Sequence, residues 1–166
     1  TFRTPRARSW GWETLAARRR ESGDMAGAVQ AYDAALAEQP ENVRLLRNMA
    51  GSLGRTGQSR RAADVLARLV TKVPDDAGAW RHLGMELAMV GSRDSAGAAL
   101  RQALELEPAS VESLNELARI LIAAPGTRRE ARALLARSLE LAPNQPRSDD
   151  LRQMVERLDR DGYGPG

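Results

Sequence analysis

The sequence predicts an all-α protein, an α-solenoid of four helix-turn-helix repeats followed by a C-terminal capping helix. Three observations predict it. Residues of the same kind recur at intervals of 34 along most of the 166-residue chain. Apolar residues within each interval recur at helical spacing. Aromatic residues make up only 4% of the chain and Ala and Leu dominate, so the interior must be closed by helix-forming side chains.

The repeat is visible in several independent columns of residues. Pro40, Pro74 and Pro108 are 34 residues apart, and Pro143 follows after 35. The other columns are Trp12, Leu46, Trp80 and Leu114; Leu15, Met49, Leu83 and Leu117; Ala16, Ala50, Gly84 and Ala118; Ala28, Ala62, Ala96 and Ala131. The repeats therefore span 9–42, 43–76, 77–110 and 111–145. One extra residue falls in the turn of the fourth repeat, between positions 121 and 131.

Each column has a physical reason. The first helix of a repeat carries apolar residues on one face, and the small residue among them lets the second helix approach closely. We therefore expect a large side chain at Gly84 to push its helix pair apart. In the second helix Ala96 marks the crossing point and Leu100 fills the space beside it. Pro108 then ends the helix, because proline lacks an amide donor and clashes with the preceding turn.

Helix starts and chain ends agree with this register. Asn42, Asp76 and Ser110 can cap the helices that follow them, and Thr127 with Glu130 matches a capping box. Residues 146–161 form an amphipathic segment that predicts a capping helix over the last repeat. Its apolar residues are Leu151, Met154, Val155 and Leu158. We expect the basic arm 1–8 and the tail 162–166 to be flexible.

These residues resemble the tetratricopeptide repeat family over Ser9 to Gln145. The third repeat matches the family pattern W-x2-L-G-x2-Y, A-x3-F, P with Trp80, Leu83, Gly84, Leu87, Ala96, Leu100 and Pro108. The chain departs from the pattern at Arg19, where an aromatic or aliphatic residue is usual. The resemblance implies a right-handed superhelix whose concave face is lined by the first helix of each repeat. It also implies a non-catalytic scaffold for protein–protein interaction.

Several classes of chemistry are disfavoured by composition. The chain has no Cys and one His, so it predicts no metal site, no cofactor and no nucleophile with a base, and hence no enzyme. The densest basic run, Arg18 to Arg20, is followed by Glu21 and Asp24, which argues against a nucleic-acid partner. No apolar run approaches the roughly 20 residues that span a bilayer, so we expect a soluble protein without direct membrane insertion. The cytoplasm and the periplasm both remain open.

A peptide-binding groove is the functional site that the resemblance implies. The residues on the first helices that are not used for packing, and that we expect to bind the peptide, are Arg44, Arg47, Asn48, Arg55, Arg81, His82, Met85, Met89, Asn115 and Arg119. Arginines occupy its centre, and acids such as Glu13 and Glu116 lie at its ends. Guanidinium groups bind carboxylates in pairs of hydrogen bonds, so we expect an extended, acidic peptide. A row of solvated arginines is the alternative.

Other interpretations stay open at this stage. The carboxylate clamp that some family members use on chaperone tails is not reproduced, because Glu13, Ala17 and Gly78 stand at clamp positions. The chain is alternatively the accessory repeat region of a larger enzyme or of a membrane-anchored assembly factor. A third possibility is a scaffold that self-associates as a homo-oligomer through Trp10 or the capping helix at the array ends. Heavy use of Arg with a single Lys indicates a GC-rich, bacterial source.

Overall fold

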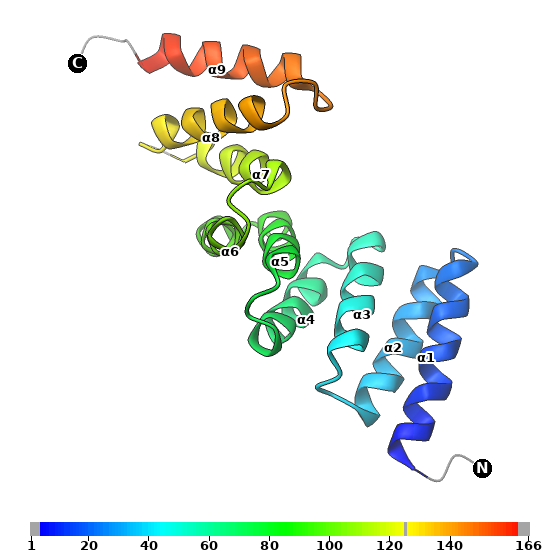
Figure 1. Cartoon of the computed structure of the whole chain (residues 1–166). Coiled ribbons are helices and arrows are strands. Elements are labelled where there is room, and N and C mark those ends of the chain that lie inside the picture. Colours follow the sequence, from blue (N-terminus) through cyan, green and yellow to red (C-terminus); the bar gives the residue numbers. More distant parts are fainter. Residues whose placement is uncertain (1–3, 125, 163–166) are drawn as a thin grey trace.

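The computed structural model describes residues 4–124 and 126–162, which form nine α-helices and no strand. The helices are α1 (Pro5–Glu21), α2 (Met25–Glu38), α3 (Val43–Arg55), α4 (Ser59–Lys72), α5 (Ala77–Met89), α6 (Arg93–Leu106), α7 (Val111–Ile122), α8 (Arg128–Leu141) and α9 (Ser148–Gly162). Each helix packs on the next, and the pairs follow an arc with α3 and α5 on its inner side and α4 and α6 on its outer side (Figure 1). The predicted all-α solenoid is confirmed.

A short turn closes each of the four helix pairs. The turn after the first helix contains a glycine with positive φ in every repeat: Gly23, Gly57, Gly91 and Gly126. Glycine adopts this left-handed conformation without the steric cost that other residues meet there. The connections between repeats end differently: the side chains of Asn42, Asp76 and Ser110 accept backbone N–H groups at the starts of α3, α5 and α7, as predicted.

The fourth turn differs from the others and corrects one expectation. It runs from 123 to 127, whereas the earlier turns have three residues. One of the two added positions arises because α7 has 12 residues where α3 and α5 have 13, and the other is the extra residue, which lies where the sequence places it. Thr127 does not form the predicted capping box. Its hydroxyl instead donates to the carbonyl oxygens of Leu121 and Ala124, which closes the end of α7. Glu130 accepts hydrogen bonds from Arg101 of α6 and not from the backbone at Thr127.

The N-terminal boundary is also different from the expected one. Helix α1 begins at Pro5, so residues 5–8 are helical and do not belong to a flexible arm. Thr4 caps this helix through Ala7 N–H, and Pro5 is favourable in the first turn, where no amide donor is needed. Arg8 then pairs with Glu38 of α2 at 2.9 Å, and Ser9 is buried against Ala35 O. Residues 1–3 and 163–166 lie outside the described part of the chain.

Small residues set the distance between the two helices of a repeat. A Cβ atom built on Gly84 would lie 2.6 Å from Leu100 Cγ and 3.1 Å from Ala96 O. Its counterparts Ala16 and Ala118 are completely buried. The column of small residues therefore marks the crossing point of each pair, as the sequence predicts.

The column of large residues, Trp12, Leu46, Trp80 and Leu114, is not equally covered in every repeat. Leu46 and Leu114 are almost fully buried, whereas Trp80 is half-buried and donates its indole N–H to Pro74 O at 2.9 Å. Trp12 remains 42% exposed, because no described helix precedes α1. The expected burial of this column thus fails at the N-terminal end of the array.

Helix α9 covers the other end. Leu158 is buried against α8, and Leu151, Met154 and Val155 are half-buried around it. Arg132 of α8 pairs with Asp159 of α9, which ties the two helices at their rim. Among the described helices, none combines the length and the hydropathy that a bilayer-spanning segment needs.

The crossing point gives a first prediction. Gly84→Ala should lower the free energy of unfolding by about 1–3 kcal/mol, because the added methyl group overpacks the contact with α6. Gly51→Ala is the matched control, since a Cβ there meets nothing within 4 Å. It should raise stability by about 0.5–1 kcal/mol through helix propensity. Urea unfolding of both variants checks this, and equal effects would contradict the assigned crossing point.

The tryptophan column gives a second prediction. Trp80→Ala should cost about 3 kcal/mol, the low end for an aromatic truncation, because the indole packs on the core and makes a hydrogen bond. Trp12→Ala should cost less than about 1 kcal/mol, as a surface change does. Chemical denaturation followed by circular dichroism measures both losses. A larger loss for Trp12→Ala would show that the N-terminal end of the array is covered.

Candidate functional site

The predicted groove residues all lie on the first helices α3, α5 and α7. Exposed side chains are Arg44, Arg47, Arg55, His82, Met89 and Arg119; half-buried ones are Asn48, Arg81, Met85 and Asn115. We call this surface, with the corresponding residues of α1, the concave groove. Arg47 and Arg81 are 34 residues apart, which is one repeat length, so they occupy equivalent positions on successive first helices.

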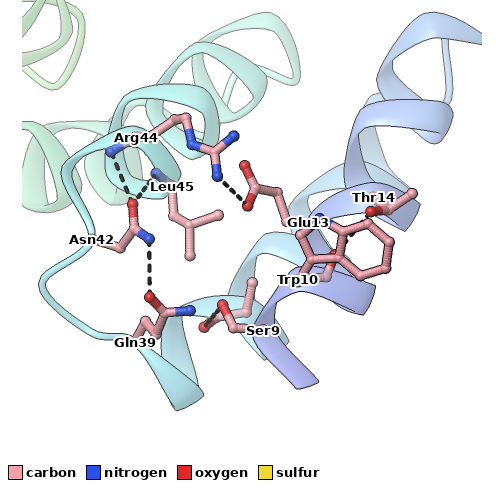
Figure 2. A network of polar contacts seen from close by, with 9 residues as sticks. Ser9, Trp10, Glu13, Thr14, Gln39, Asn42, Arg44 and Leu45 are labelled. Atoms are coloured by element: carbon pink, nitrogen blue, oxygen red, sulfur yellow. Dashed lines mark hydrogen bonds and ion pairs between the residues drawn. The ribbon is translucent and has the colours of Figure 1, made fainter. Parts of the chain in front are cut away.

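Arg44 is not free. Its guanidinium group contacts Glu13 Oε2 of α1 at 2.7 Å, and Glu13 is only 13% exposed in its side chain (Figure 2). The start of α3 is fixed at the same place, since Asn42 accepts the backbone N–H groups of Arg44 and Leu45 and donates to Gln39. The ion pair therefore links the first two repeats across the groove.

Arg47 is also paired, with a carboxylate of the next repeat. Its Nη1 atom lies 2.5 Å from Asp76 Oδ2. Asp76 in turn caps α5 by accepting the Ala79 N–H at 3.0 Å. Burial alone would raise the pKa of Asp76, but the hydrogen bond from Ala79 and the charge of Arg47 outweigh it and hold the pKa below its ordinary value. The sequence-based picture of a purely basic centre overlooked this carboxylate.

The polar groups of the fourth repeat are held by local contacts. Arg119 pairs with Glu116 at 2.7 Å, one turn away on α7. Asn115 donates to Gln145 Oε1 at 2.6 Å, and Gln145 donates to Ser138. Asn48 of the second repeat accepts a hydrogen bond from Arg20 of α1. These side chains are therefore oriented by neighbours before any ligand arrives.

Two arginines of the groove differ from the rest. Arg55 and Arg81 make no ion pair with any other residue that the structure describes. The position equivalent to Arg55 in the next repeat is Met89, which is 75% exposed. The pKa of His82 lies below its ordinary value, because neighbouring groups reduce its hydration and Arg81 is positively charged. Among the ten predicted groove residues, Arg55 and Arg81 are thus the charged side chains without an ion pair to a described residue.

A hollow of about 490 Å³ lies at the N-terminal end of the groove. It is lined by Thr4, Arg6, Ala7, Trp10, Glu13, Gln39, Asn42 and Arg44. Trp10 is 62% exposed here and stands on α1 beside Glu13 (Figure 2). Arg6 and Gln39 were missed from sequence, because residues 1–8 were expected to be a flexible arm and Gln39 lies between helices.

A second hollow of about 270 Å³ lies at the other end, between α7 and α9. Its lining residues are Asn115, Glu116, Arg119, Ile122, Leu135, Pro146, Arg147, Asp150, Leu151 and Met154. Half of this lining comes from the loop before α9 and from α9 itself, so periodicity within the repeats could not reveal it. Within the described ranges, no three His, Cys, Asp or Glu side chains are placed to hold a metal ion.

A comparison with protein families matches a tetratricopeptide repeat model to residues 19–84 and 87–155. The chain belongs to the tetratricopeptide repeat family. The family predicted from the columns of residues is thereby confirmed. A search of the curated proteins finds no match.

Several solved tetratricopeptide repeat structures have the same fold. A MamA protein has a TM-score of 0.80 at 19% identity, over 95% of this chain and 96% of that one. YrrB, a tetratricopeptide repeat protein with an unusual peptide-binding site, has a TM-score of 0.71 at 16% identity, over 90% and 86% of the two chains. The TPR2B domain of yeast Sti1, in a complex with pHsp70, has a TM-score of 0.63 at 17% identity, over 72% and 97%.

The Asp76 cap gives a third prediction. Asp76→Ala should lower the free energy of unfolding by about 1 kcal/mol at pH 7, because α5 loses its cap. The folded-state pKa is depressed, so this stabilisation is present above the unfolded pKa, about 3.9, and is lost as pH falls through the folded value. The difference between parent and variant should therefore become smaller as the pH is lowered from 7 to 3 in urea titrations.

The neighbouring Asp75→Ala is the control for this prediction. Asp75 is exposed and is not the helix cap, so its removal should change stability by less than about 0.5 kcal/mol at either pH. A loss at Asp76 that persists undiminished at pH 3 would contradict the role of its ionised carboxylate.

Proposed function

We propose that this protein is a non-catalytic interaction scaffold whose concave groove binds an extended, acidic segment of a partner protein. Membership of the tetratricopeptide repeat family supports a scaffold. Two proteins of similar fold also support it, because YrrB has a peptide-binding site and the Sti1 domain is in a complex with pHsp70. The same activity would apply if the chain is the accessory repeat region of a larger protein.

The observation that carries the acidic preference is the free charge of Arg55 and Arg81. Both residues belong to the predicted groove positions, and neither forms an ion pair with a described carboxylate. A carboxylate that binds there gains charge-assisted hydrogen bonds without breaking a contact within the chain. We therefore place the first carboxylates of the ligand at these two residues.

Arg44 and Arg47 have a different part in this proposal. A ligand carboxylate must compete there with Glu13 and Asp76, so the net gain is smaller than at a free arginine. Both residues contribute mainly to the local field and help to select against basic segments. This revises the expectation from sequence, in which all the central arginines had equal weight.

Apolar contacts would complete the binding surface. Met85 and Met89 provide a flexible, polarisable surface, and Trp10 provides an exposed indole at the hollow beside Glu13. Exposed aromatic and Met side chains are enriched at protein interfaces. The ligand we infer thus has acidic residues for the centre of the groove and an apolar residue for the end near Trp10.

A quantitative pull-down tests the proposal. The parent chain and an Arg55→Glu, Arg81→Glu variant are compared as baits in lysate of the source cell. The variant reverses the two free charges, so acidic partners should be captured at least about tenfold less efficiently. Candidate partners are identified by mass spectrometry and their segments are then titrated as labelled peptides.

The matched control is Arg60→Glu, Arg93→Glu. These exposed arginines stand on the outer helices α4 and α6, and the change in net charge is identical. The control should capture the same proteins as the parent. Equal capture by all three baits, each shown to be folded, would overturn binding in the concave groove.

A further inference from the structure

A second surface of the molecule lies on α1, outside the concave groove. We call it the open-end strip and define it by Gly11, Trp12, Leu15, Arg18 and Arg19. Its apolar part forms a hollow of about 500 Å³ lined by Arg8, Gly11, Trp12 and Leu15. Trp12 is 42% exposed although it occupies a packing column of the repeat.

In the later repeats, the equivalent face of the first helix is a packing surface. The first helix of each later repeat packs against the second helix of the repeat before it. The positions of α3 and α7 that correspond to Gly11, Leu15, Arg18 and Arg19 are all buried: Leu45, Met49, Ser52 and Leu53, and Ser113, Leu117, Ile120 and Leu121. In α5 the equivalents are Ala79 and Leu83, which are buried, and Glu86 and Leu87, which are half-buried. In α1 the same positions are half-buried or exposed. The open-end strip is thus a helix-binding face that no described helix covers.

The strip differs from the covered faces in carrying positive charge. At the positions of Arg18 and Arg19, α3 has Ser52 and Leu53, α5 has Glu86 and Leu87, and α7 has Ile120 and Leu121. Arg19 Nη1 lies 3.9 Å from Asp24 Oδ2, whereas Arg18 has no ion pair with any described residue. A helix that covers the strip must therefore offer apolar side chains at one end and acceptors at the other.

We propose that the open-end strip binds an acidic amphipathic helix of another protein. Gly11 permits close approach of that helix, and its apolar residues pack over Trp12 and Leu15. Arg18 follows Gly11 by seven residues, which is about 10 Å along the axis of α1. A Glu or Asp about two turns from the apolar contact then reaches Arg18. The binding mode is a helix laid on an apolar face.

Charge argues against a second copy of this chain as the occupant. Two α1 helices that pair in antiparallel fashion around Gly11, Trp12 and Leu15 bring Arg8 of one copy beside Arg18 of the other. Like charges at an interface cost free energy, and α1 carries no acid on the strip to offset them. A partner helix with acidic residues meets no such penalty.

The test uses two labelled peptides and the full chain. Both are Ala-rich helical peptides of about 20 residues, long enough to form helix in water. Both carry Leu at positions i, i+3, i+4 and i+7, and they differ only in flanking Glu or Lys. Fluorescence anisotropy should show binding of the Glu peptide, with an affinity at least about tenfold above that of the Lys peptide. Trp12→Ala and Arg18→Glu should each weaken it by about tenfold or more.

Two control variants separate this site from the concave groove. Arg60→Glu reverses an exposed charge of α4 outside both surfaces and should bind the Glu peptide like the parent. Arg55→Glu reverses a charge of the concave groove, which we propose binds extended segments, and should retain binding of this helical peptide. A loss of binding in Arg55→Glu but not in Arg18→Glu would move the site to the groove and overturn the inference. Absence of binding by the folded parent, or equal binding of the Lys peptide, would also overturn it.

Sedimentation velocity tests the remaining occupant. The parent chain should remain a monomer across the concentration range of the binding assay. A dimer that Trp12→Ala dissociates and that Arg18→Glu strengthens, by relieving repulsion from Arg8, would assign the strip to a second copy. This outcome would overturn the inference without affecting the proposal for the concave groove.

Discussion

The close approach of the two helices in each repeat is the constraint on which the rest of the structure depends. Gly84 leaves no room for a Cβ atom against Leu100, and buried alanines stand at the equivalent positions of the other repeats. A helix pair held this closely presents two further faces, one toward each neighbouring pair. The next pair packs on that face in the same way, so the contact repeats along the chain and the arc of Figure 1 results.

Packing at the crossing points also decides which residues are available for binding. The side chains that close the pairs are buried, and those between them on the first helices are the residues that we predict to line the concave groove. Most polar groups there are already engaged, since Glu13 holds Arg44 and Asp76 holds Arg47. Among the predicted groove residues, Arg55 and Arg81 have no such ion pair. A count of arginines in the sequence overestimates the positive charge of the groove, because it ignores the carboxylates that neutralise Arg44 and Arg47.

Features that depend on residues close together in the sequence could be predicted. Contacts between residues of different repeats could not. The columns, the caps at Asn42 and Asp76 and the extra residue before α8 follow from helical periodicity and local hydrogen bonding. The partner of Arg44 lies 31 residues away on another helix, and nothing in the local pattern selects it. The expected arm 1–8 failed for a related reason, since Arg8 is held by Glu38 of α2.

The first and last helices that the structure describes differ from the helices between them for one physical reason. Each of α3, α5 and α7 is covered by the preceding pair, so the face that it presents to that pair is mostly apolar. At the C-terminal end α9 covers α8 with apolar residues and an ion pair between Arg132 and Asp159. At the other end α1 combines an uncovered indole at Trp12 with Arg18 and Arg19. Such a mixture suits a surface that must tolerate water when alone and still gain free energy when a helix covers it.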